Sequence, residues 1–261
     1  MIIQTTYGRK IKGKIGGDDI EYTQIIEKWQ TYKIQAVSDI DKYLDSFRVL
    51  FAYNSGKIEN ENINYYDTRE IFENGKVISF TDDIRTIFEL KNQKDCYELL
   101  KHKIVEKEPM TIELVKKIHY ELMKGTYDER RYIDNEEYPG EFKKHSYIVG
   151  INEVGSDAED VEADIEALLE DINNNDNGDV LKAGAFLHAN FENIHPFADG
   201  NGRVGRTLLN YYLMVNNHPP IIVYEEDKLR YYKALQGFDE TLKLDELYEF
   251  LKEQCIKTWS K

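Results

Sequence analysis

Helical spacing of apolar residues is the feature that constrains this chain most. From Tyr22 onward apolar side chains repeatedly recur every three or four positions, with only 5 prolines in 261 residues to interrupt them. Side chains at that spacing share one face of a helix, and such a face is buried against another element. The pattern predicts a mainly α fold. A hydrophobic content of 41% is ordinary for a globular protein with one sizeable core.

Individual helices are expected where this spacing is clearest. One or two helices are predicted from Ile25 to about Ala52, followed by a short helix that begins near Ser55 and is capped by the Ser55 hydroxyl. Further helices are expected after Thr81, Pro109, Val161, Val180 and Arg203. The segment from Val180 to Phe191 is apolar on nearly all sides, which predicts a helix buried in the middle of the domain.

One segment departs from the helical pattern. Pro139-Gly140 marks a turn, and the residues from His145 to Val149 are rich in β-formers and edged by polar residues. We therefore expect a small β-hairpin that projects from a helical body. Over the whole chain we expect a flexible N-terminal arm at residues 1–20, a helical region at 21–105 and a core domain at 106–261.

Composition argues against several classes of protein. The formal net charge is −15, whereas nucleic-acid binding depends on clustered Lys and Arg, so no nucleic-acid partner is expected. No apolar run approaches the roughly 20 residues of a membrane span. Cys96 and Cys255 suggest neither a disulfide framework nor a zinc site. A cytoplasmic protein without membrane contact is expected.

The residues that suggest chemistry are concentrated between positions 194 and 206. This run joins the apolar helix to the helix that follows it. Gly200 and Gly202 let a ligand approach the backbone closely, and the unpaired N–H groups of a helix N-terminus favour an anion. The loop is therefore expected to cradle a phosphate group.

Four side chains of this run are suited to phosphate chemistry. Arg203 and Arg206 are three positions apart, share a helix face and can hold one polyphosphate. Asp199 suits Mg²⁺ held against phosphate oxygens, and His195 can take up a proton near neutral pH. The combination predicts phosphoryl or nucleotidyl transfer, where catalysis is mainly positioning and charge neutralisation. Taken singly, each residue also fits a helix cap, a turn or a surface charge.

The same run carries a family resemblance. His195 to Arg206 matches without gaps the Fic signature His-x-Phe-x-(Asp/Glu)-Gly-Asn-Gly-Arg-x-x-Arg. The chain resembles Fic proteins over roughly residues 112–256. The resemblance implies a Fic-fold helical bundle that transfers AMP from ATP to a Ser, Thr or Tyr hydroxyl of a target protein, with ATP as co-substrate and Mg²⁺ as cofactor.

The resemblance also implies a role for each defining residue of the run. His195 would be the general base that deprotonates the target hydroxyl, and Asp199 would bind Mg²⁺. Phe197 would anchor the loop in the core. The phosphates would be held by Gly200, Asn201 and Gly202 at the α- and β-positions, by Arg203 at the β-position and by Arg206 at the γ-position.

Two other segments resemble parts of the Fic site. The predicted hairpin at 140–150 is similar to the flap on which an extended segment of the target protein docks, although Gly140-Glu141-Phe142-Lys143 lacks the Arg often found there. Tyr231 and Tyr232 resemble the aromatic part of the adenine pocket, and ordinary packing explains them equally well.

A regulatory segment is expected upstream of the core. Residues 55–60 fit the inhibitory pattern (Ser/Thr)-x-x-x-Glu-(Gly/Asn), with Ser55 and Glu59 on one helix face. This resembles the Fic class with an N-terminal inhibitory helix, class II. There the resemblance implies that Glu59 pairs with Arg206 at the γ-phosphate position and keeps the enzyme mostly inactive. A Ser-capped helix followed by Glu also arises without an inhibitory role.

Other functions stay open. Some Fic proteins that keep this glutamate remove AMP from modified proteins, and Glu59 would then position a water. A non-catalytic nucleotide-sensing module is another alternative, against which the presence of His195 argues. Transfer of UMP or phosphocholine also occurs in the family, whereas the intact Arg203 and Arg206 argue against a reversed ATP pose. Self-AMPylation and homo-oligomers are further expectations.

Overall fold

The computed structural model describes residues 17–77, 84–147, 155–174 and 178–260. Within these ranges the chain forms helices, turns and irregular segments and contains no strand, so the prediction of a mainly α fold is confirmed. None of the helices described is long and apolar enough to cross a membrane.

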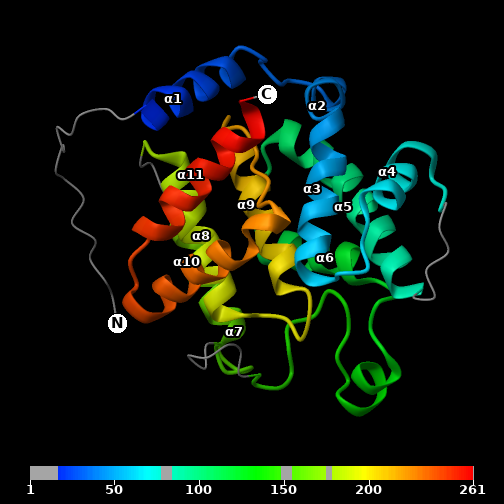
Figure 1. Ribbon diagram of the computed structural model, residues 1–261. Helices are drawn as coiled ribbons and strands as arrows, with labels where there is room; N and C mark the ends of the chain where they lie inside the picture. The colour runs from blue at the N-terminus through cyan, green and yellow to red at the C-terminus, as the bar shows by residue number, and fades with distance from the viewer. Residues whose placement is uncertain (1–16, 78–83, 148–154, 175–177, 261) are drawn as a thin grey trace.

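Figure 1 shows the arrangement of the helices. The α-helices are α1 Gly17–Gln30, α2 Val37–Tyr43, α3 Asp45–Glu59, α4 Tyr65–Asn74, α5 Ile84–Glu106, α6 Ile112–Met123, α7 Val161–Asn173, α8 Val180–Ile194, α9 Asn201–Val215, α10 Lys228–Thr241 and α11 Asp245–Trp259. A short π-helix, η1, covers Arg130–Asp134, and a short 3-10 helix, η2, covers Glu225–Asp227.

Helix α8 and helix α9 pack against each other in the middle of the molecule (Figure 1). Helices α7, α10 and α11 also pack on α8, which explains why α8 is apolar on nearly all sides. One hydrophobic cluster extends from α2 and α3 through α5 to α9, and a second joins α8 and α9 to α10 and α11. The predicted central helix is therefore confirmed, and it ends directly at the 195–206 run.

Side-chain caps determine where several helices begin. The Asn64 side chain accepts a hydrogen bond from the N–H of Asp67 at the start of α4 (2.9 Å), and Thr111 caps α6 in the same way. Asp179 accepts from the N–H of Lys182 at 3.0 Å and caps α8. Each cap satisfies a backbone donor that the helix itself leaves unpaired. The Asp179 cap therefore sets the start of the helix that leads to the site.

The helix expected to begin near Ser55 is not found, and this prediction was wrong. Helix α3 runs from Asp45 to Glu59, so Ser55 lies inside its last turns and caps no N-terminus. Gly56 lies inside this helix, where its lack of a side chain leaves room for Ile63, since a Cβ at Gly56 would lie 2.6 Å from Ile63 Cδ1. Ser55 and Glu59 consequently lie at the C-terminal end of α3, one turn apart.

Two predicted segments lie partly outside the described residues. Residues 140–147 of the predicted hairpin form turns and bends, and 148–150 are outside the described ranges, so the hairpin stays a prediction. Residues 1–16 of the predicted arm are also outside, and residues 17–20 belong to α1. Trp29 of α1 contacts Trp259 of α11, with ring centroids 5.2 Å apart, so α1 lies against the C-terminal helix (Figure 1).

Truncating a core side chain of α8 is expected to destabilise the protein strongly. Leu187 is 0% exposed, so Leu187→Ala removes buried apolar volume and is expected to lower the free energy of unfolding by about 2–5 kcal/mol. The matched control is Leu229→Ala on α10, because Leu229 is 84% exposed, and a change within about 0.5 kcal/mol is expected. Urea unfolding measures both variants, and equal losses would contradict the central position of α8.

Candidate active site

The candidate site lies where α8 ends and α9 begins. His195 follows α8 in a left-handed backbone conformation, with φ 51° and ψ 61°, and its N–H donates to the carbonyl of Phe191 at 3.1 Å. Gly200, with φ 85°, precedes the first residue of α9. A Cβ at Gly200 would lie 2.5 Å from Met123 Sδ. Both backbone conformation and available space therefore favour glycine at this position.

Phe197 anchors the loop between the two helices. Its side chain is 0% exposed and stacks on His119 of α6, with ring centroids 3.7 Å apart and planes 2° apart. Asn201 holds the backbone of Phe197 at both groups. Its Oδ1 accepts from the Phe197 N–H at 2.9 Å, and its Nδ2 donates to the Phe197 carbonyl at 2.7 Å. The Asn201 side chain thus shapes the loop.

His119 connects this loop to residue 140. The N–H of Gly140 donates to His119 Nδ1 at 2.7 Å, so in the neutral ring Nε2 carries the proton and donates to the Asp199 carbonyl at 3.0 Å. Burial lowers the pKa of His119 to about 3, which keeps the ring neutral. The first residue of the predicted flap and the loop between α8 and α9 are therefore held by the same imidazole.

His195 is neutral at physiological pH. Burial, followed by the positive charge of Lys143, lowers the pKa of His195 to about 4. A hydrogen bond between the His195 ring and the backbone of Glu192 contributes in the opposite direction. The imidazole at the entrance to the loop is therefore in the form that accepts a proton.

Arg206 is buried against the C-terminal end of α3. It is 1% exposed, and its Nε donates to Ser55 Oγ at 3.1 Å. Its Nη2 donates to the Ser55 carbonyl at 2.9 Å and to Glu59 Oε1 at 2.8 Å. The structure thus brings Ser55, Glu59 and Arg206 together. Burial by itself would lower the pKa of Arg206, because it disfavours the charged guanidinium. Contributions in the opposite direction, of which the negative charge of Glu59 is the largest, together outweigh burial, and the pKa of Arg206 is raised.

Arg203 and Asp199 contact charged residues of α5. Arg203 Nη1 lies 3.0 Å from Glu89 Oε1, and Asp199 Oδ2 accepts from Arg85 Nη2 at 2.9 Å. Burial alone would raise the pKa of Asp199, but the charges of Arg203 and Arg85 outweigh it and lower that pKa. Asp199 is therefore an ionised carboxylate, a suitable ligand for a cation.

Both arginines keep an unpaired donor. Arg203 Nε and Arg206 Nη1 are buried and have no hydrogen-bond partner among the described residues. An unpaired buried donor is unfavourable by about 1–3 kcal/mol, more for a charged group. A Cβ at Gly202 would lie 3.0 Å from Arg206 Nη1 and 2.4 Å from Glu59 Oε1, so this glycine leaves room for the Glu59 carboxylate. The first turn of α9 therefore lies next to the carboxylate of Glu59.

The described residues fit Mg²⁺ only in combination with phosphate oxygens. No group of three or more His, Cys, Asp or Glu side chains that could hold a metal occurs in the described ranges. Mg²⁺ in nucleotide sites, however, needs only one or two carboxylates besides the phosphates. Asp199 is such a carboxylate, although its ion pair with Arg85 would have to break for it to bind the metal.

Tyr231 and Tyr232 lie in different environments. Tyr231 is 1% exposed, bonds through its OH to His188 Nε2 at 2.7 Å and has its ring 5.9 Å from Arg206 Cζ. Tyr232 is 40% exposed, and burial and then the charge of Glu59 raise its pKa to about 12. Tyr231 therefore packs behind Arg206 and Tyr232 is accessible beside it, while their contact with adenine stays a prediction.

Sequence reasoning missed residues that reach the site from α5 and α6. Arg85, Glu89 and His119 lie on amphipathic helices, where charged or polar residues are ordinary. Their spacing carries no signal, because only helix packing brings them to the loop. For Asn60 the sequence did give an indication, because Asn60 is the last residue of the inhibitory pattern. The pattern does not predict which group the Asn60 side chain contacts.

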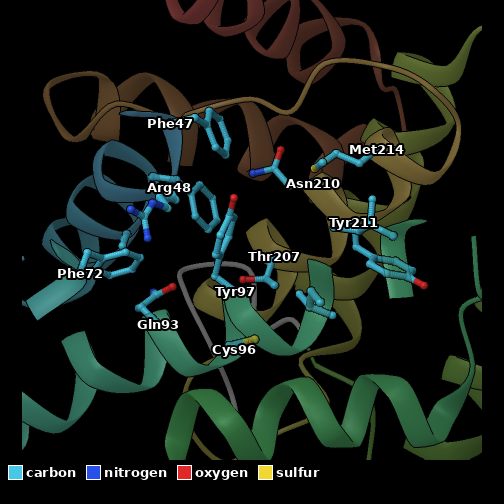
Figure 2. Close-up of a pocket in the computed structure, with 14 residues that line it drawn as sticks. Phe47, Arg48, Phe72, Gln93, Cys96, Tyr97, Thr207, Asn210, Tyr211 and Met214 are labelled. Carbon is cyan, nitrogen blue, oxygen red and sulfur yellow. The ribbon is translucent and has the colours of Figure 1, made fainter. Parts of the chain in front are cut away.

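A separate pocket between α3, α4, α5 and α9 is shown in Figure 2. Its labelled residues include Phe47 of α3, Tyr97 of α5 and Asn210 of α9, and its cavity volume is about 50 Å³. Such a volume suits a few water molecules rather than a nucleotide. None of the loop residues 195–203 lines it, so it is not the candidate site.

An ionised carboxylate, a neutral histidine, two buried arginines and a helix N-terminus are groups suited to contact with a phosphorylated ligand. Residues 109–213 match the model of the Fic/DOC family. This part of the chain is therefore a Fic/DOC-family domain.

Curated relatives match over a short stretch. Protein adenylyltransferase Fic from Aedes aegypti is 42% identical over 60 residues, which make up 23% of this chain and 12% of that protein. Protein adenylyltransferase Fic from Culex quinquefasciatus is 40% identical over 60 residues, with the same coverage of 23% and 12%. The match thus spans only a small part of the length of these relatives.

Solved structures share the fold over most of the chain. A Fic domain containing signaling protein from Bacteroides thetaiotaomicron is 22% identical, with a TM-score of 0.77 over 92% of this chain and 94% of that chain. A fragment of Fic-1 from C. elegans is 20% identical, with a TM-score of 0.76 over 93% of this chain and 71% of that chain. The shared fold therefore extends beyond residues 109–213.

Acid is expected to destabilise the folded chain because several histidines are buried in the neutral form. Burial lowers the pKa values of His119 and His188 to about 3 and those of His195 and His218 to about 4. The unfolded chain titrates near the ordinary value of about 6.5 and binds more protons below it. Stability should thus fall as the pH drops from about 6.5 toward 4. Glu192, whose pKa burial raises to about 8, acts in the opposite direction.

Urea unfolding midpoints at pH 7 and pH 5 measure this effect, and a lower midpoint is expected at pH 5. His218→Gln removes one buried neutral ring and should reduce the difference between the two midpoints. His102→Gln is the matched control, because His102 is exposed, and it should leave the difference unchanged. If His218→Gln did not change the difference between the two midpoints, this result would contradict the burial of a neutral His218.

Proposed function

We propose that this chain is a protein adenylyltransferase, which transfers AMP from ATP to a hydroxyl group of a target protein. The observation that carries the proposal is the pair of buried, unpaired donors, Arg203 Nε and Arg206 Nη1, at the start of α9. A triphosphate supplies the oxygens that such donors lack. The names of the curated relatives support the same chemistry.

The helix N-terminus and the two arginines bind the triphosphate in this proposal. Backbone N–H groups at Asn201 and Gly202 face the α- and β-phosphates, and Arg203 binds the β-phosphate through its unpaired edge. Arg206 binds the γ-phosphate once Glu59 has left. Asp199 would hold Mg²⁺ together with phosphate oxygens, and the metal would neutralise charge on the phosphates when bound.

His195 acts as the general base of the transfer. Its neutral ring takes the proton of the target hydroxyl, and the hydroxyl oxygen forms a bond to the α-phosphorus. The bond from the α-phosphorus to the oxygen that bridges to the β-phosphate breaks, and pyrophosphate leaves. The products are an AMP ester of the target and a protonated His195. The target is proposed to dock along residues 140–150.

Glu59 keeps the enzyme inactive in this proposal. Its Oε1 lies 2.8 Å from Arg206 Nη2 and close to Gly202, where the γ-phosphate would need the same guanidinium. A carboxylate and a phosphate cannot both occupy this space, and like charges at such a distance repel. ATP therefore binds productively only after the end of α3 has moved or Glu59 has been replaced.

Removal of AMP is a second candidate function, and the accessibility of Glu59 favours it. The Glu59 side chain is 31% exposed although it is paired with Arg206, so water can reach its carboxylate. A water positioned there would attack the α-phosphorus of an AMP-modified protein. AMP would leave with the new oxygen, and the target oxygen would regain its proton.

Replacement of Glu59 is expected to activate AMP transfer. With Mg²⁺ and α-labelled ATP, Glu59→Gly should label itself or proteins of a lysate at least about tenfold more than wild type, because Arg206 is then free for phosphate. Adding His195→Ala to Glu59→Gly should lower labelling by about 100-fold or more. Glu61→Gly is the control, because Glu61 is exposed and two residues away, and it should behave as wild type.

The same assay with γ-labelled ATP checks the direction of the chemistry, since AMP transfer leaves no γ-label on the protein. Labelling from γ-labelled ATP would contradict AMP transfer. Absence of labelling in every variant, together with release of AMP from a modified protein by wild type, would favour the second candidate function.

A further inference from the structure

Glu89 is a buried carboxylate of α5 that lies outside the 195–206 run. It is 3% exposed, and its Oε1 lies 3.0 Å from both Arg203 Nη1 and Arg85 Nε. Its Oε2 accepts a hydrogen bond from Asn60 Nδ2 at 2.8 Å. Burying a carboxylate is unfavourable unless it is paired and hydrogen-bonded. Two guanidinium groups and one amide meet this requirement, so the position of Glu89 is closely defined.

The contact with Glu89 leaves Arg203 Nε without a hydrogen-bond partner among the described residues. Glu89 occupies Nη1, whereas Nε has no partner among the described residues. Nη2 lies 3.7 Å from Asp199 Oδ1, which is longer than a hydrogen bond. Nε and Nη2 together form the edge of a guanidinium that binds two oxygens of an anion side by side. Glu89 therefore contacts Arg203 at Nη1, and Nη1 is not part of the Nε–Nη2 edge that would bind the anion.

Asn60 connects Glu89 to the end of α3. It directly follows Glu59 and is the C-cap of α3, where its N–H donates to the Gly56 carbonyl at 2.9 Å. Its side-chain Nδ2 donates to Glu89 Oε2 at 2.8 Å and lies 3.0 Å from Thr86 Oγ1. Consecutive residues of α3 thus reach both arginines of α9, Arg206 through Glu59 and Arg203 through Asn60 and Glu89.

We propose that Glu89 is a positioning residue that orients the Nε–Nη2 edge of Arg203 for a phosphate group, and that Asn60 couples Glu89 to the end of α3. The proposal rests on the proposed function, since it requires a phosphorylated nucleotide in the site. Glu89 itself touches no substrate. Arg85 shares Glu89 Oε1 and contacts Asp199 Oδ2 at 2.9 Å, so the same carboxylate also steadies the residue that holds Asp199.

Nucleotide binding distinguishes a positioning role from a merely structural one. In the Glu59→Gly background, Glu89→Gln is expected to raise the Kd for ATP on the order of tenfold, because a charged hydrogen bond to Arg203 is lost. The Kd for adenosine, which has no phosphate, should stay within about twofold. Isothermal titration calorimetry measures both, and a merely structural change would weaken ATP and adenosine alike.

Glu98→Gln is the matched control for this substitution. Glu98 lies on the same helix and pairs with Lys101 at 2.6 Å, but it is exposed to solvent. It should leave both Kd values unchanged. Unchanged or tighter ATP binding by Glu89→Gln would overturn the positioning role, as would parallel loss of both ligands.

Asn60→Ala tests whether Asn60 couples Glu89 to the end of α3. This substitution leaves the buried carboxylate of Glu89 intact. It should weaken ATP binding selectively, and adding it to Glu89→Gln should cause little further loss, because both changes act on one contact. Additive losses would overturn the link. A Glu59→Gly parent that binds adenosine but not ATP would instead overturn the proposed function, and with it this inference.

Discussion

A single buried guanidinium joins the end of α3 to the first turns of α9. Arg206 is 1% exposed and is held by the hydroxyl and the carbonyl of Ser55 and by the carboxylate of Glu59. The carbonyl end of a helix carries partial negative charge, which suits a cation, but a buried charge still requires an anion. Glu192 lies nearby, but burial raises its pKa to about 8, which disfavours its charged form near pH 7. Glu59 is therefore the anion on which Arg206 depends.

This constraint links inhibition to nucleotide binding in the proposed function. If Glu59 leaves, the guanidinium stays buried and needs another anion, and a phosphate group meets the same requirement. Helix α3 and the nucleotide would then compete for one partner, without any large rearrangement of the loop. Asn201 and His119 hold the backbone groups of the loop.

The candidate site is larger than the part of the chain that the family model matches. The match covers residues 109–213, whereas Ser55, Glu59, Arg85 and Glu89 precede it and contact its charged residues. Both arginines of α9 are thus paired with carboxylates from outside the matched range. Helices α3 and α5 therefore belong to the site physically, although the signature lies entirely on the α8–α9 turn.

The sequence by itself determined the mainly α architecture, the central helix and the position of the turn between α8 and α9, because helical spacing and a contiguous run of residues are local properties. It placed the start of a helix wrongly at Ser55, because local spacing did not show that one helix runs from Asp45 to Glu59. It gave no indication of Glu89 as the partner of Arg203. Which carboxylate meets which arginine is decided by how α3 and α5 pack on α9, and that depends on the whole core rather than on any one segment.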